Sequence, residues 1–256
     1  MIYHTKKNNQ KAGLSNNYAG LTAFTLAEVL ITLGIIGIIA AITIPNIVSA
    51  YKKKVVEVKL KRTYSVILNA VKASDNENGN LVYLSKPIWD EHTYYGALYF
   101  FDDYLKPYLK FIKDDGTKGS SYYAYANTVD GVPHNNGPAD SGRTVILSDG
   151  TRVTFFMEHY LWPYNSNSEY KIGNLRVKFG PFNDYDYIGK NTFMFNLTYT
   201  KKGEGNVNIS GYSQAGDNIC ESSALIPLCK SGNAAACTSM IQCNNWHIPD
   251  DYPVKF

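Results

Sequence analysis

The chain has 256 residues, 45% of them hydrophobic, which is enough for one globular domain beside an apolar N-terminal segment. Its net charge of +3 comes from Lys6, Lys7 and Lys11, because residues 24–256 hold 22 basic and 22 acidic residues. A chain balanced in this way lacks the overall positive charge of nucleic-acid-binding proteins, so we predict no nucleic-acid partner.

The first predicted element is an apolar helix at residues 24–44, FTLAEVLITLGIIGIIAAITI, which contains a single charged residue, Glu28. A helix of this length covers about 30 Å, the thickness of the hydrocarbon core of a bilayer. A secretory signal peptide would be cleaved near Val48-Ser49-Ala50, but its apolar part is usually only about 7–15 residues long. A plain membrane anchor explains the length and gives Glu28 no role, although a charge deep in a bilayer costs about 2.5–3.5 kcal/mol.

The residues Ala23-Phe24-Thr25-Leu26-Ala27-Glu28-Val29-Leu30 resemble the prepilin cleavage and methylation motif of type IV pilins and type II secretion pseudopilins. In that family a prepilin peptidase cuts on the cytoplasmic side, just before the phenylalanine, and methylates the new amino terminus. The resemblance implies a cut between Ala23 and Phe24, so that Glu28 becomes the fifth residue, where the family places its glutamate. Gly37 and Pro45 also lie where family members often carry the glycine and proline that loosen the stalk helix.

The same resemblance implies a fibre subunit without enzymatic activity. Glu28 would pair with the amine of Phe24 in its own or a neighbouring subunit, so that neither charge is buried alone in the fibre. The implied partners are prepilin peptidase, other pilin or pseudopilin subunits, an inner-membrane assembly platform with its ATPase, and the lipid bilayer. The subunit would start as a single-pass inner-membrane protein with an extracytoplasmic head and end in a periplasmic or extracellular fibre.

The sequence then divides into a cytoplasmic leader at residues 1–23, a transmembrane and stalk helix at 24–75, and a pilin-like head at 76–256. Pro45 cannot donate a hydrogen bond within a helix, so we expect the helix to kink or unwind near it. The helical pattern resumes beyond Pro45 and continues to about Ala73. Its apolar stripe consists of Val56, Leu60, Tyr64, Ile67 and Val71.

In the head, apolar spacing predicts a second helix at about 96–112 that breaks at Pro107, followed by a loop at 114–142. Asp149-Gly150 predicts a hairpin turn. The strands that we expect are 144–147, 152–157, 175–179, 192–199 and, less regular, 207–210. These elements predict an α+β fold, in which the stalk helix packs on an antiparallel sheet and a disulfide-pinned C-terminal region closes the head.

The last 37 residues contain all four cysteines, Cys220, Cys229, Cys237 and Cys243. No pair has the C-x-x-C spacing of many zinc and redox sites, so we expect two disulfides in a loop-rich tail and an oxidising compartment. Four cysteines allow three pairings, and the spacing does not select one of them.

The only metal that we consider is calcium, with Asp184 and Asp186 as oxygen ligands. Their surroundings do not match an EF-hand, because Phe195 stands where the bidentate glutamate would be, so we favour a solvated turn. We expect no other cofactor. The sequence contains no H-E-x-x-H, G-x-S-x-G or phosphate-binding glycine motif, which argues against a secreted hydrolase.

Two hypotheses remain. The first is a structural subunit of a type IV pilus or type II secretion pseudopilus, polymerised through its N-terminal helix. The second is a membrane-tethered extracytoplasmic module that binds a ligand or acts as a sensor through its tyrosines. They differ in processing, because the first needs a cut before Phe24, whereas a tether would retain residues 1–23.

Overall fold

The computed structural model describes residues 24–79, 99–118, 126–127, 133–134, 142–156, 169–180, 186–200, 208–211, 220 and 222–256. The chain divides into two compact units, residues 1–47 and residues 48–256. Helix α1 (Leu26–Asn78) contributes to both units. The sheet, its core and the C-terminal helices all belong to the second unit.

Helix α1 is longer than the sequence pattern predicts. It passes through Pro45 without unwinding, so of the two outcomes expected near this residue, a kink or unwinding, the unwinding is wrong. It also continues beyond Ala73, and in its polar last turn the side-chain amide of Asn78 donates to the carbonyl oxygen of Ser74 at 3.2 Å. Gly79, the residue that most often follows a helix end, comes next.

The second predicted helix is confirmed only in part. Residues 99–108 are helical and include a π-helical turn, η1 (Phe101–Leu105), and a 3-10 turn, η2 (Lys106–Tyr108). The expected break at Pro107 is confirmed, since this residue lies in the 3-10 turn where the helical segment ends. Residues 96–98 lie outside the described part, and residues 111–112 belong to a strand and not to the helix.

Six antiparallel strands form the main sheet, in the order β1-β4-β5-β6-β8-β9. Their bounds are β1 (Phe111–Lys118), β4 (Gly142–Leu147), β5 (Arg152–Phe156), β6 (Glu169–Lys178), β8 (Thr192–Thr200) and β9 (Asn208–Ser210). Three short strands form a second sheet in the order β3-β2-β7, namely β2 (Ala126–Asn127), β3 (Pro133–His134) and β7 (Asp186–Tyr187).

The predicted strands are confirmed, whereas the predicted loop at 114–142 is wrong where β1, β2 and β3 lie. The turn at Asp149-Gly150 joins β4 to β5, and the amide of Leu147 donates to the carbonyl of Thr151 at 2.8 Å. Strand β1 was predicted as a loop because it contains Asp114 and Asp115, and aspartate is typical of turns and loops. It pairs with β4 in spite of two register shifts.

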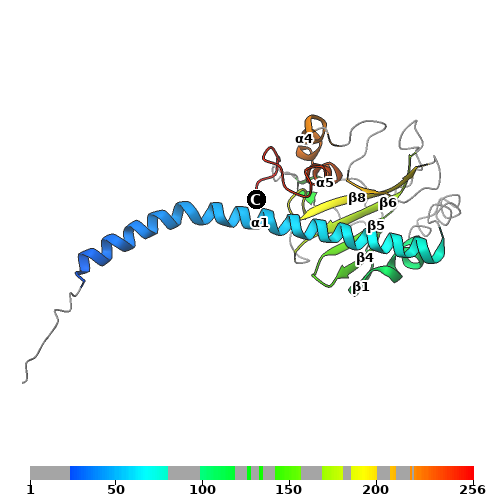
Figure 1. Cartoon of the computed structure of the whole chain (residues 1–256), viewed down its shortest axis with the longest axis horizontal. Helices are drawn as coiled ribbons and strands as arrows, with labels where there is room; N and C mark the ends of the chain where they lie inside the picture. The colour runs from blue at the N-terminus through cyan, green and yellow to red at the C-terminus, as the bar shows by residue number, and fades with distance from the viewer. Residues whose placement is uncertain are drawn as a thin grey trace, which may run out of the picture. The chain divides into compact units, whose positions relative to one another are not determined.

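The core of the head lies between α1 and one face of the main sheet (Figure 1). On α1, the buried side chains recur at helical spacing: Val56, Leu60, Thr63, Ile67, Ala70, Val71 and Ser74. The ring of Tyr64 lies 5.9 Å from that of Phe195 on β8, and the rings of Phe101 and Phe155 stack at 5.5 Å. This arrangement confirms the predicted α+β fold, with the second half of the long helix packed on an antiparallel sheet.

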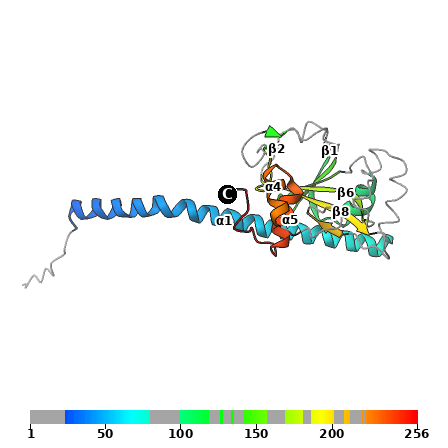
Figure 2. The same ribbon diagram turned by 90° about the horizontal axis from the view of Figure 1, so that it is seen from above.

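The C-terminal region contains two helices, α4 (Ser222–Lys230) and α5 (Ala234–Cys243), so the expectation of a loop-rich tail is wrong. The cysteines pair as Cys220–Cys243 and Cys229–Cys237, which resolves the choice among three pairings. Helix α5 lies beside β8 (Figure 2), and the hydroxyl of Thr238 accepts a hydrogen bond from the amide of Met194 at 3.1 Å. The C-terminal region is therefore pinned by disulfides and packed on the sheet.

Candidate functional site in the N-terminal half of helix α1

The N-terminal half of helix α1 presents its apolar side chains to the outside. Phe24 is 85% exposed, and the leucines, isoleucines and valines that follow as far as Val48 are exposed as well. The most apolar 18-residue window has a mean hydropathy of 2.4 and buries none of its residues. The helix is long and apolar enough to cross a membrane. Such a surface needs lipid or protein around it.

Each polar side chain of this half makes a hydrogen bond to its own helix. The hydroxyls of Thr32 and Thr43 donate to the carbonyls of Val29 and Ile39, both at 2.9 Å. The amide of Asn46 donates to Ile42 at 3.4 Å, and Thr25 and Glu28 bond to each other. Because these groups are hydrogen-bonded, the hydroxyls and the amide of this half can enter an apolar environment already paired. Glu28 alone carries a charge, which hydrogen bonds from Thr25 do not neutralise.

Thr25 and Glu28 form a reciprocal cap at the start of α1. The backbone amide and the hydroxyl of Thr25 donate to the Glu28 carboxylate at 2.8 and 3.0 Å, and the amide of Glu28 donates to the Thr25 hydroxyl at 3.2 Å. This is a capping box, which satisfies amides that a helix start leaves without partners. A plain anchor therefore also gives Glu28 a role, contrary to the sequence-based argument. The T-x-x-E pattern before an apolar run was the signal for it.

The other residues of the predicted assembly site fall on the same half helix or just before it. Ala23 lies outside the described residues, and in the uncut chain the nitrogen of Phe24 is a peptide nitrogen, with no amine to pair with Glu28. Gly37 and Pro45 both lie within α1. No atom lies within 4 Å of the position that a side chain would take at Gly37, so the backbone there is open to close approach by another helix.

The second half of α1 is held by a clasp from the C-terminal segment. The Glu57 carboxylate accepts a hydrogen bond from the backbone amide of Ile248 at 3.0 Å and lies 3.3 Å from Nδ1 of His247. Lys54 contributes an ion pair at 3.2 Å. Partial burial raises the pKa of Glu57, but these three partners outweigh it and hold the pKa below its ordinary value. Sequence reasoning missed this clasp, because about 190 residues separate its members.

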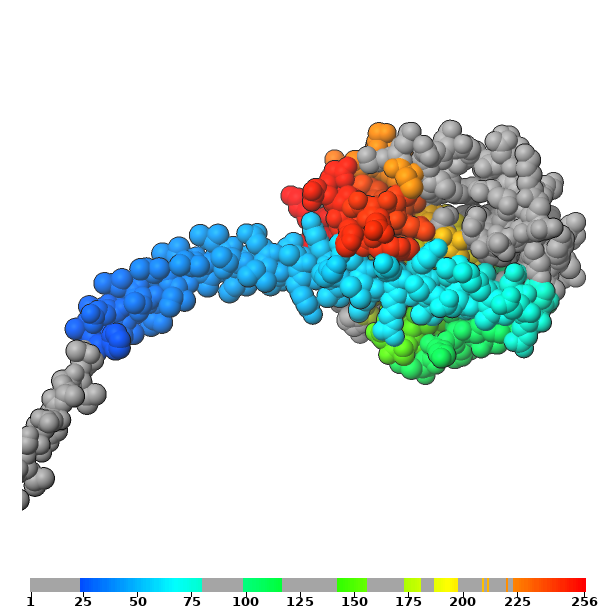
Figure 3. Space-filling model, in the orientation of Figure 1, coloured from blue at the N-terminus to red at the C-terminus, as the bar shows by residue number. Residues whose placement is uncertain are grey.

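Aromatic packing reinforces the clasp. The ring of Trp246 lies 4.7 Å from Tyr64 of α1 and 6.4 Å from Phe195 of β8. Figure 3 shows the C-terminal segment in red directly against the second half of the helix. Further along, the buried hydroxyl of Tyr252 donates to the carbonyl of Gly189 at 2.8 Å. The last residues thus tie α1 to the sheet.

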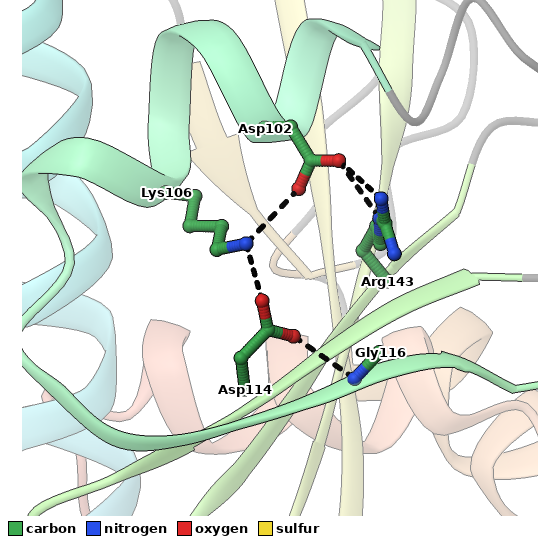
Figure 4. A network of polar contacts seen from close by, with 5 residues as sticks. All are labelled: Asp102, Lys106, Asp114, Gly116 and Arg143. Atoms are coloured by element: carbon green, nitrogen blue, oxygen red, sulfur yellow. Dashed lines mark hydrogen bonds and ion pairs between the residues drawn. The ribbon is translucent and has the colours of Figure 1, made fainter.

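A charged network joins the helical turns to the edge of the sheet (Figure 4). Asp102 accepts hydrogen bonds from Arg143 at 2.9 and 2.5 Å, and Lys106 lies between Asp102 and Asp114. The hydrogen bond with Lys106 is the main cause that lowers the pKa of Asp114, and its counterpart raises the pKa of Lys106. Opposite charges alternate, and the groups come from η1, η2, β1 and β4, so the network serves as a structural tie.

A surface groove of about 340 Å³ lies between α1 and the β4–β5 hairpin. Arg62 and Asp149 form an ion pair there at 3.4 Å. Burial raises the pKa of Asp149, but hydrogen bonds from Thr151 and the charge of Arg62 outweigh it and lower the pKa. The hydroxyl of Ser148 accepts a hydrogen bond from Arg62 at 3.4 Å. The residues that line the groove are Arg62, Val66, Asn69, Tyr108, Lys110, Leu147, Ser148 and Asp149.

The calcium hypothesis gains no support from the part of the chain that the structure describes. Asp184 lies outside it, and Asp186 is placed only as a backbone position of β7. Within the described ranges, no three side chains of histidine, cysteine, aspartate or glutamate gather as a metal site would require.

Comparison with known proteins gives a match for the head and for the last residues of the N-terminal half of helix α1. No curated protein and no solved structure matches the chain. One family model matches residues 46–256, a range that begins next to Pro45 and includes the whole described head. The chain therefore belongs to DUF6613, a family of unknown function.

Proposed function

We propose that the chain is a structural subunit of a type IV pilus or type II secretion pseudopilus, processed before Phe24 and polymerised through its N-terminal helix. The observation that carries this proposal is the division of helix α1. One face of its second half is buried against the sheet, whereas its first half exposes its large apolar side chains. A subunit built in this way can exchange lipid contacts for contacts with the same half of other subunits.

Processing gives Glu28 a second partner. A cut before Phe24 creates an amine one residue ahead of Thr25, the residue that already bonds to Glu28. Transfer of the apolar half into a fibre core makes an unpaired carboxylate costly, and a cationic amine from the same or a neighbouring subunit removes that cost. Glu28 therefore has two separable roles, helix capping and charge pairing.

We predict that Glu28→Gln abolishes fibre assembly although helix α1 still forms. Glutamine serves in a capping box as glutamate does, so the substitution keeps the cap and removes only the charge. Breaking a buried pair costs about 3–5 kcal/mol, which corresponds to a loss on the order of 100- to 1,000-fold in incorporation. The measurement is the amount of subunit in sheared fibres, in cells that carry the assembly machinery, with membrane content and the mass of the mature chain as internal checks.

Thr25→Ala is the matched control. It removes the hydroxyl of the cap, at a cost of about 1 kcal/mol, and leaves the carboxylate of Glu28 in place. We expect near-normal assembly of this variant. Wild-type assembly of Glu28→Gln would restrict Glu28 to capping and favour a membrane-tethered binding or sensor module. An equal defect in both variants would mean that the defect of Glu28→Gln cannot be assigned to the lost charge.

A further inference from the structure

The part of α1 that follows the apolar half is strongly basic. Between residues 48 and 74 it carries seven basic residues and one acidic residue, Glu57. The basic residues are Lys52, Lys53, Lys54, Lys59, Lys61, Arg62 and Lys72. These residues differ in whether they contact the rest of the head.

The head engages the members of this run that lie nearer its core. The ammonium group of Lys59 lies 5.7 Å from the centre of the Phe179 ring, and Arg62 pairs with Asp149. Lys54 lies 3.2 Å from Glu57, but its side chain remains 63% exposed. The Glu57 carboxylate also accepts a hydrogen bond from the backbone amide of Ile248, so Lys54 is not its only partner.

Four of these side chains make no hydrogen bond or ion pair within the described ranges, namely Lys52, Lys53, Lys61 and Lys72. Of these four, Lys52 and Lys53 lie nearest the apolar segment. Lys52 is exposed and Lys53 is half-buried, and Tyr51 beside them is 69% exposed. Three consecutive helical positions span about 200° of the helix circumference, so Lys52, Lys53 and Lys54 together present cations to most directions around α1. They begin five residues after Ile47, the last residue of the first unit, which corresponds to about 8 Å along a helix.

We propose that Lys52, Lys53 and Lys54 bind the anionic headgroups of the bilayer that holds the apolar half before assembly. The inference rests on the proposed function, in which the subunit is held in the bilayer before assembly (the membrane stage). A lysine near an anionic surface contributes about fivefold to binding. Long lysine side chains and an exposed tyrosine next to an apolar segment suit the headgroup region. The three lysines would hold the subunit at a fixed depth until the assembly machinery withdraws it.

The test uses the full chain in nanodiscs that contain equal amounts of phosphatidylglycerol and phosphatidylcholine. Native mass spectrometry of the released protein gives the ratio of the two lipids that remain bound. We expect wild type to retain phosphatidylglycerol preferentially, and the triple variant Lys52→Gln, Lys53→Gln, Lys54→Gln to lose that preference by at least about tenfold. High salt should weaken the preference of wild type in the same direction.

A second triple variant, Lys72→Gln, Lys230→Gln, Lys255→Gln, removes the same charge from exposed positions elsewhere in the head and should keep the wild-type ratio. An unchanged ratio in the first triple variant, or no preference in wild type, would overturn the lipid site. Flotation with pure phosphatidylcholine vesicles separates the lysine site from the membrane stage of the proposed function. A chain that floats but shows no lipid preference in the nanodiscs contradicts only the lysine site. A chain that does not float contradicts the membrane stage itself.

Discussion

Replacing Phe195 with alanine will lower the free energy of unfolding of the head by about 3–5 kcal/mol. Phe195 is fully buried on β8, where its ring meets Tyr64 of α1 and Trp246 of the C-terminal segment. The substitution leaves a cavity where helix, sheet and clasp meet, and the three elements cannot all move inward to fill it. Urea unfolding of the full chain in detergent, followed by tryptophan fluorescence, measures the loss.

Tyr99→Ala is the matched control, because Tyr99 is also aromatic but is 60% exposed. We expect it to change the free energy of unfolding by less than about 1 kcal/mol. Similar losses in both variants would mean that Phe195 is not at the centre of the packing between α1 and the sheet, and would contradict the description of the core.

The second large effect is expected at Gly189, where alanine should cost about 2–4 kcal/mol. Gly189 has a φ of +75°, and an added Cβ would lie 2.7 Å from the hydroxyl of Tyr252 and 2.8 Å from Val254. The substitution therefore combines an unfavourable backbone conformation with a collision against the C-terminal segment. The collision follows from the close contact that the Tyr252 hydroxyl makes with the Gly189 carbonyl.

Gly150→Ala separates these two contributions. Gly150 has a nearly equal φ of +79°, but nothing lies within 4 Å of an added Cβ. It should lose only the conformational part, about 1–2 kcal/mol. Thermal or urea unfolding of both variants gives the difference, and equal losses would show that the C-terminal segment does not pack on Gly189 as described.

Periodic patterns allowed much of the fold to be predicted. The stripe from Val56 to Val71 identified the buried face of α1, since one-sided burial produces helical spacing. The Asp149-Gly150 turn identified the β4–β5 hairpin. Helices α4 and α5 escaped prediction, because Pro227 lies inside the first and the second is buried nearly all round, which removes the one-sided pattern.

The position of the candidate site in the sequence could be predicted, but its contacts with distant residues could not. The apolar run and the position of Glu28 could be read directly, and the capping box with Thr25 could have been, since it is a local pattern. The clasp of Glu57 on Ile248 could not, because only the folded chain brings residues so far apart in sequence together. The Asp102–Arg143 pair was missed for the same reason.

The family match and the functional proposal rest on different parts of the chain. The family model begins at residue 46 and therefore describes the head, whereas the proposal depends chiefly on residues 24–44. The structure links the two parts by a continuous helix, which passes from the exposed apolar half into the buried half.

The most direct test of the account is the mass and N-terminal sequence of the mature protein, recovered from native membranes or from shed fibres. Prepilin processing predicts a chain that begins at Phe24 with a methylated amino terminus. An intact Met1 would indicate a simple membrane anchor, and a start near Tyr51 would indicate a secreted protein released by a signal peptidase. Either of these two results would contradict the proposal that this chain is a fibre subunit.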